Sequence, residues 1–303
     1  MKEINDYLHR TAQLLIRNAS FIEPIGLIDG KMGIAVFLYT YARYANKEIY
    51  TKYADELIDE ILQSLSHELP LNTNSGISGI GVGLDYLARN HFVEIESEKT
   101  FLDIDFFMKK KEVLFSQQAF DIINLNSFAY WKNRPCSEET NHRIVLLISR
   151  LEGIFNDTNQ MPPLPLDVLA HSFFVLKMSM NQQIAPEKTH VLQEKIHLSI
   201  NQNENLSALM FHLWNNLFPE KRIDKTYILS LKELITLSNL QLIYSSDIET
   251  RTYYENTTSK IPEKRVLTNI LNSANMQNLG LKYYPAGTAW FLINYIQSKT
   301  SCS

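Results

Sequence analysis

The sequence predicts an all-α protein in which an inner ring of helices is wrapped by an outer ring, built from six or seven helical hairpins. Three observations support this prediction. Glycine clusters recur at a fixed spacing, apolar residues recur at steps of three and four almost everywhere, and helices that are apolar all round alternate with amphipathic ones. A fixed period of this size is typical of repeats made of two-helix units.

The glycines carry the clearest repeat signal. Nine of the ten glycines lie in three clusters, Gly26 to Gly33, Gly76 to Gly83, and Gly280 to Gly287, and each cluster opens an apolar run. The first two clusters superpose at an offset of 46 residues, which places Gly30 on Gly76 and Gly33 on Gly79. We therefore expect two successive repeats of the same unit at the start of the chain.

The periodicity predicts a helix in nearly every segment. We expect helices over 3–19, 31–46, 48–67, 76–90, 100–115, 117–132, 139–155, 164–180, 186–201, 204–217, 226–245, 261–276 and 285–298. Runs that are apolar all round need cover on every side, so they are assigned to the inner layer: 31–42, 164–180, 205–218 and 285–296. Amphipathic runs are assigned to the outer layer: 53–62, 187–200 and 225–237.

No linker divides the chain, so we expect a single domain over residues 1–303. Inner helices are expected to start near 33, 79, 125, 167, 208, 245 and 287, roughly one hairpin apart. The most polar insertion, 247–260, is expected to be a surface loop.

Composition excludes several classes of function. The formal net charge is −4 and the pI is about 6.1, and the basic run Lys109–Lys111 is short, so we expect no nucleic-acid partner. Two cysteines in a chain of this length are typical of a reducing compartment. The sequence shows no secretory signal and no apolar stretch long enough for a membrane span, and a cytoplasmic location is therefore expected.

The glycine motif Gly26-Leu-Ile-Asp-Gly30-Lys-Met-Gly33, repeated as Gly76-Ile-Ser-Gly79-Ile-Gly81-Val-Gly83, resembles the lanthionine synthetase C-like (LanC-like) family. The segment from Tyr284 to Leu292 is similar to a final, eroded copy. The resemblance implies an α/α toroid with a glycine repeat at the head of each inner helix. It also implies ribosomal peptide modification, in which a cysteine thiol adds to a dehydrated serine or threonine to form a thioether ring.

In this family a zinc ion held by two cysteines and a histidine converts the substrate thiol to a thiolate, which is the nucleophile. The sequence contains no Cys-His-Gly, and Cys136 and Cys302 stand at no inner-helix head. We therefore expect a zinc-less member with no cofactor, which acts as a peptide-binding or helper protein. Its expected partner is a peptide substrate or a modification enzyme, and whether it is itself an enzyme stays open.

Candidate ligand-binding residues surround the expected cavity where the first and last repeats meet. They are Asp29, Gly30, Gly33, Ser78, Gly79, Gly81, Asp85, Tyr283 and Tyr284. The glycines either allow close packing or leave helix N-termini bare toward a ligand. Asp29 is expected to cap the helix that follows it, and Asp85 to pair with Arg89 at i+4.

Three alternatives stay open. His171 and His212 lie in consecutive apolar helices and are weak metal candidates, although buried structural histidines are the commoner case. Carboxylates in an α/α barrel serve as acid and base in glycoside chemistry, which suggests a carbohydrate-active enzyme. The residues for that alternative are Asp29, Asp85, Asp105 and Asp167. The aromatic residues either form core or line a cavity: Phe37, Tyr39, Tyr41, Tyr44, Tyr283, Tyr284 and Trp290.

Overall fold

The described part of the chain is helical. The computed structural model describes residues 2–66, 68–94, 101–108, 137–156, 166–203, 206–225, 229–244, 267, 269, 271, 281 and 286–300. Every regular element in these ranges is a helix, which confirms the prediction of an all-α protein for them. In the same ranges, no helix combines the length and the apolar character needed to cross a membrane. The expected helix at 117–132 and the expected inner starts near 125 and 245 lie outside them.

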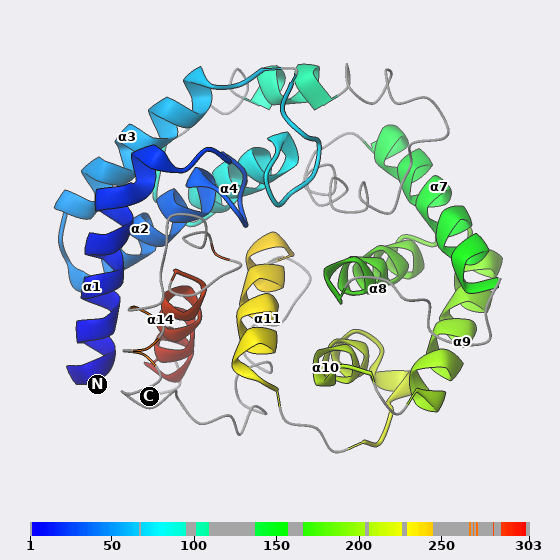
Figure 1. The fold of residues 1–303 in the computed structure, drawn as a ribbon. Helices are drawn as coiled ribbons and strands as arrows, with labels where there is room; N and C mark the ends of the chain where they lie inside the picture. Colours follow the sequence, from blue (N-terminus) through cyan, green and yellow to red (C-terminus); the bar gives the residue numbers. More distant parts are fainter. Residues whose placement is uncertain are drawn as a thin grey trace. The chain divides into compact units, whose positions relative to one another are not determined.

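The chain divides into two compact units, one of residues 1–116 and 234–303 and one of residues 117–233. The first contains α1 (Lys2–Asn18), η1 (Ala19–Phe21), α2 (Lys31–Ala45), α3 (Ile49–Gln63), α4 (Ile77–Arg89), a helical stretch at 101–108, most of α11 (Leu231–Ile243) and α14 (Ala286–Thr300) (Figure 1). The second contains α7 (Ser137–Asn156), α8 (Leu166–Asn181), α9 (Pro186–Gln202), α10 (Ala208–Leu217) and η3 (Pro219–Lys221). The single domain and the closed ring of hairpins stay predictions.

The first hairpin, α2 and α3, shows the two expected helix classes. Every residue of α2 from Lys31 to Ala42 is buried, as an all-round apolar helix requires. By contrast, α3 buries one stripe, made of Tyr50, Ala54, Leu57 and Ile61, which lies at helical spacing. The buried Lys31 ammonium is ion-paired with Glu60 of α3, so the one charge inside this hairpin has a partner.

The first two repeats have the same local structure. In each repeat, the first two N–H groups of the inner helix donate to main-chain carbonyls that lie seven residues earlier, in the loop before the helix. The bonds are Lys31 N to Pro24 O (3.0 Å), Met32 N to Ile25 O (3.3 Å), Ile77 N to Pro70 O (2.9 Å) and Ser78 N to Leu71 O (3.3 Å). These partners match at the offset of 46 seen in the sequence, so the repeat is structural.

The glycines allow neighbouring repeats to interlock through main chain. A Cβ atom at Gly79 would lie 2.6 Å from the Leu27 nitrogen, and one at Gly26 would lie 2.6 Å from the Asn74 oxygen. The two loops are joined by the bond from Ile28 N to Asn74 O (3.0 Å). No side chain fits between them, which is why glycine is needed at these positions.

The same contact continues along the inner helices of the first unit. A Cβ at Gly33 of α2 would lie 2.9 Å from the Leu281 side chain, and one at Gly287 of α14 would lie 2.7 Å from Ile235 of α11. Since Leu281 precedes Gly287 by six positions, as Leu27 precedes Gly33, it occupies the equivalent place in a third copy. The inner helices therefore neighbour one another in the order α4, α2, α14, α11, and the expectation that the first and last repeats meet is confirmed.

One layer assignment was wrong. The run 225–237 was expected to form an outer, amphipathic helix, but α11 begins only at Leu231 and is mostly buried. It contacts α14 through the bond from the Trp290 indole N–H to the Ser238 carbonyl (3.4 Å). The charged residues that suggested an exposed face, Lys232 and Glu233, lie in its first turn, where a helix of either layer reaches solvent.

The second unit is built around Trp214 of α10. Its ring meets Phe173 of α8 edge-on, with centroids 5.4 Å apart, and lies 4.4 Å from Phe218. Its indole N–H donates to the Lys221 carbonyl (2.9 Å), so the one polar atom of this buried ring is satisfied. The helices α8 and α10 are the buried pair here, while α9 buries one face, and both assignments agree with the expected layers.

The N-termini of α10 and α11 share one carboxylate. Glu233 accepts hydrogen bonds from Ser230 N (2.8 Å), from Leu209 N (3.1 Å) and from the Ser207 hydroxyl. Ser230 and Glu233 form the reciprocal capping box of α11, and the other carboxylate oxygen caps α10. Burial alone would raise the pKa of Glu233, but these bonds offset it and hold the pKa below its usual value.

The glycine contacts predict a steric penalty. Gly79→Ala should lower the free energy of unfolding by about 2 kcal/mol or more, because the new methyl group meets rigid main chain of the neighbouring repeat. Gly153→Ala in α7 is the control, since a Cβ there meets nothing within 4 Å. It should be neutral or stabilising by about 0.5–1 kcal/mol. Denaturant unfolding of both variants measures this, and equal stability of the two would contradict the packing account.

Glu233 predicts a pH dependence. Its pKa is lowered in the folded state, so its stabilising contribution is present above the unfolded pKa of about 4.5 and is lost as the pH falls through the folded value. At neutral pH, Glu233→Gln should cost about 1 kcal/mol, the usual value of a cap. Denaturant unfolding at neutral pH and below pH 4.5 measures this. The difference in free energy of unfolding between the wild type and this variant should be smaller at the acid pH. Glu56→Gln, at an exposed position in the middle of α3, is the control.

Candidate functional site

The structure brings together the two glycine-rich helix heads that the sequence singled out. The N–H groups of Ile28 and Asp29 both donate to the Asn74 carbonyl (3.0 Å each), which joins the loop before α2 to the loop before α4. Gly30, Gly33, Gly79 and Gly81 are all buried at this junction. These candidates therefore lie side by side, as expected, although their role in ligand binding stays a prediction.

The helix heads present a different surface from the one expected. The first N–H groups of α2 and α4 are bonded to main-chain carbonyls of their own loops, so they are not free donors at a cavity rim. Ser78 is fully buried, and its hydroxyl lies 3.3 Å from the hydroxyl of Thr73. At these positions the packing interpretation of the glycine motif is the one that the contacts support.

Asp29 does not cap α2, and that expectation was wrong. The residue at the cap position is Gly30, which has extended main chain, and no side chain accepts a bond from the helix there. The physical reason is that the carbonyls of Pro24 and Ile25 already satisfy the donors that a capping carboxylate would take. The Asp29 side chain is half-buried beside this junction.

Asp85 has the partner that the sequence predicted. Its carboxylate is ion-paired with Arg89 one turn later in α4, and both side chains are partly exposed. The carboxylate is therefore used in a contact within its own helix. Asp105 lies in the helical stretch 101–108, and the side chain of Asp167 lies outside the described residues.

Most of the aromatic residues form core. Phe37, Tyr39, Tyr41 and Trp290 are at most 4% exposed. Trp290 of α14 meets Tyr86 of α4 edge-on, with centroids 5.9 Å apart, across the inner layer. Tyr44 is partly exposed and donates to the Asn5 side chain (2.7 Å). Tyr283 and Tyr284, the candidates from the closing repeat, lie outside the described residues.

His171 of α8 and His212 of α10 are buried in neighbouring helices of the second unit, 2% and 3% exposed. Burial lowers the pKa of His212 to about 4, so its imidazole is neutral at physiological pH. Within the described ranges, no three histidine, cysteine, aspartate or glutamate side chains are grouped so that they could hold a metal ion. The two histidines therefore have no third metal ligand beside them among the described residues.

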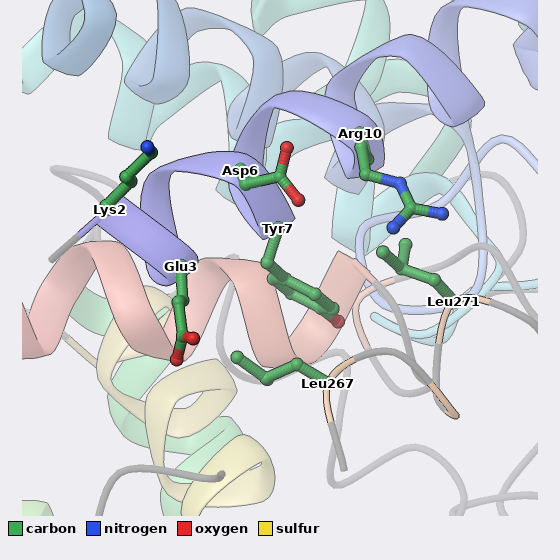
Figure 2. Close-up of a pocket in the computed structure, with 7 residues that line it drawn as sticks. All are labelled: Lys2, Glu3, Asp6, Tyr7, Arg10, Leu267 and Leu271. Atoms are coloured by element: carbon green, nitrogen blue, oxygen red, sulfur yellow. The ribbon is translucent and has the colours of Figure 1, made fainter. Parts of the chain in front are cut away.

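A cavity of about 320 Å³ beside α1 was missed by sequence reasoning (Figure 2). Lys2, Glu3, Asp6 and Arg10 of α1 surround it, and Leu267 and Leu271 lie opposite. Tyr7 points from α1 toward the two leucines, and burial raises the pKa of its phenol, which stays protonated. The cavity is lined by two basic and two acidic residues, so its charge does not identify a ligand.

His212 predicts a second pH effect. Since the folded state resists protonation down to pH about 4 while the unfolded state takes up the proton near 6.5, stability should rise with pH across this interval. The full effect is on the order of 3 kcal/mol. Replacing His212 by Gln should flatten that part of the stability profile, measured by denaturant unfolding. His142→Gln, at an exposed position on α7, is the control.

Comparison with known proteins agrees with the helical repeats. No curated protein and no solved structure matches the chain. A family model does match it, described as "Lanthionine synthetase C-like protein", over residues 22–160. This range holds both complete glycine motifs and the interlocked loops before α2 and α4. The resemblance carried by the glycine motifs is thus confirmed, and residues 22–160 of this chain are lanthionine synthetase C-like.

Proposed function

We propose that this protein is a zinc-less LanC-like protein that binds a ribosomally made peptide and assists its modification by a partner enzyme. The observation that carries the proposal is the combination of the family match over residues 22–160 with a sequence that contains no Cys-His-Gly. The first supports the peptide as the partner. The second supports a role other than ring closure by the protein itself.

The chemistry of the family shows why the missing motif matters. Zinc supplies the thiolate that attacks the dehydrated residue, and such a site needs three protein ligands. This chain has two cysteines, Cys136 and Cys302, which lie 166 positions apart and outside a Cys-His-Gly context. His171 and His212 are enclosed by the apolar helices α8 and α10. The donor set does not fit the zinc site of the family, so we derive no catalytic step through zinc.

The carbohydrate-active alternative gains no support from the described carboxylates. Asp85 is held by Arg89, and Asp29 borders a junction of main chain. Peptide binding remains the better-supported function. The two cysteines agree with a reducing, cytoplasmic setting, in which precursor peptides are modified.

The proposal predicts a low zinc content, binding of a precursor peptide, and no ring closure by the protein alone. Protein purified without a chelator or a metal-affinity tag should contain well under one zinc per chain by elemental analysis. The precursor peptide encoded beside this gene should bind the protein in a titration. The dehydrated precursor should keep all its cysteine thiols after incubation with the protein alone, counted by alkylation and mass spectrometry.

Two outcomes would contradict the proposal. Stoichiometric zinc together with loss of precursor thiols would make the protein a cyclase, and a neighbouring gene set for sugar use with no precursor binding would favour the carbohydrate alternative. Asp29→Asn and Tyr284→Ala test the predicted cavity. Lost binding at unchanged melting temperature would support a site there, whereas lost stability with binding intact would limit these residues to packing.

A further inference from the structure

A groove of about 470 Å³ lies between α3 and the end of α4 with the residues that follow it, and Tyr39 of α2 also lines it. The aliphatic part of its lining comes from Ile58 and Leu62 of α3 and Leu84 of α4. The polar part comes chiefly from three carboxylates, Asp55, Asp59 and Glu94. All of these residues belong to the first unit.

Within the described part of the chain, the three carboxylates have no ion-pair partner. Elsewhere on the same hairpin, Glu48 is paired with Lys52 and Glu60 with Lys31. Among the described residues, no lysine or arginine is ion-paired with Asp55, Asp59 or Glu94. Asp55 and Asp59 lie one helical turn apart, a spacing at which like charges repel. A cation that entered the groove would relieve this repulsion.

The floor of the groove is held in place before any ligand arrives. Tyr39 of α2 is 2% exposed, and its hydroxyl donates to the Asp55 carboxylate (2.5 Å). Burial and, after it, the bond to Asp55 raise the pKa of this tyrosine, so the phenol stays a donor at physiological pH. The bond orients one oxygen of Asp55 and leaves the other to the groove.

The far wall is fixed by Arg43. Its guanidinium carbon lies 3.6 Å from the centroid of the Phe92 ring, and it donates to the carbonyls of Asn90 (2.8 Å) and His91 (3.1 Å). Phe92 in turn packs on Tyr39, with centroids 5.9 Å apart. Among the described residues, the Arg43 guanidinium is thus used to hold the chain that follows α4 and is not paired with the carboxylates of the groove.

We propose that this groove docks a lysine or arginine side chain of a basic peptide segment, with the aliphatic stem on Ile58, Leu62 and Leu84 and the charged head among Asp55, Asp59 and Glu94. The occupant follows from the lining. Lysine and arginine bury their stems on apolar surface and keep their heads in a polar one. The inference rests on the proposed peptide-binding function and specifies that the peptide is basic. A bare metal ion would leave the apolar walls uncovered.

The test uses the full chain and a labelled pair of probe peptides in fluorescence anisotropy titrations. One probe is acetyl-Leu-Lys-Leu-Lys-Leu-amide, and the other has glutamine in place of each lysine. The lysine peptide should bind more tightly, and raised salt should weaken it. Asp59→Asn and Glu94→Gln should each weaken it by about 2- to 5-fold, as for partly exposed charge pairs. Neither residue accepts the Tyr39 bond, so the hairpin stays folded in both variants.

Glu56→Gln is the matched control, because it removes the same charge from an exposed position on α3 that does not line the groove. Its affinity for the lysine peptide should equal that of the wild type. Equal binding of the two peptides would overturn the inference, as would an equal loss in Glu56→Gln and Asp59→Asn. Self-association of the chain that Glu94→Gln abolishes would assign the groove to a second copy and would also overturn it.

The same variants separate this inference from the proposed function. Precursor binding that is unaffected by Asp59→Asn and Glu94→Gln would overturn the groove assignment while the helper function stands. Lysine-peptide binding that these variants weaken, in a protein that does not bind the precursor, would support the groove and contradict the proposed function.

Discussion

The first unit depends on the contact between a glycine in the first turn of an inner helix and the loop of the neighbouring repeat. At Gly79 this neighbour is the main chain of Leu27, and at Gly33 it is the Leu281 side chain. Because main chain lies against main chain, the loop before α2 also donates two hydrogen bonds to the Asn74 carbonyl of the loop before α4. The helices α4, α2, α14 and α11 are held in sequence by one repeated contact, although their segments are far apart in the chain.

This contact also limits where a ligand can bind. The first donors of α2 and α4 are used by their own loops, and Ser78 is sealed inside. A motif that looks like a row of bare helix N-termini is therefore a packing device at these two heads. The groove that we propose for a basic peptide lies elsewhere in this unit, around Asp55, Asp59 and Glu94.

The same rule relates burial to charge at the buried helix heads and at the exposed groove. Buried polar groups are paired or kept neutral: Lys31 has Glu60, Tyr39 stays protonated against Asp55, and His212 stays unprotonated between apolar helices. The carboxylates of Asp55, Asp59 and Glu94 are exposed to solvent, and no described lysine or arginine is ion-paired with them. Their charge costs the folded chain little in solvent, and it is available to an incoming cation.

The sequence by itself determined the helices, the 46-residue repeat and the resemblance that the family model confirms over residues 22–160, because helical periodicity and glycine spacing are local properties. The pairing of Asp85 with Arg89 was predictable for the same reason. Only the tertiary structure decided that α11 is buried, that Gly30 and not Asp29 occupies the cap position of α2, and that a groove forms. The cap position of α2 depends on the path of the loop before it, whose carbonyls at Pro24 and Ile25 accept from the first N–H groups of the helix. The burial of α11 and the groove depend on contacts between segments distant in sequence, such as those that carry Tyr39, Asp59 and Glu94, and no local pattern encodes that proximity.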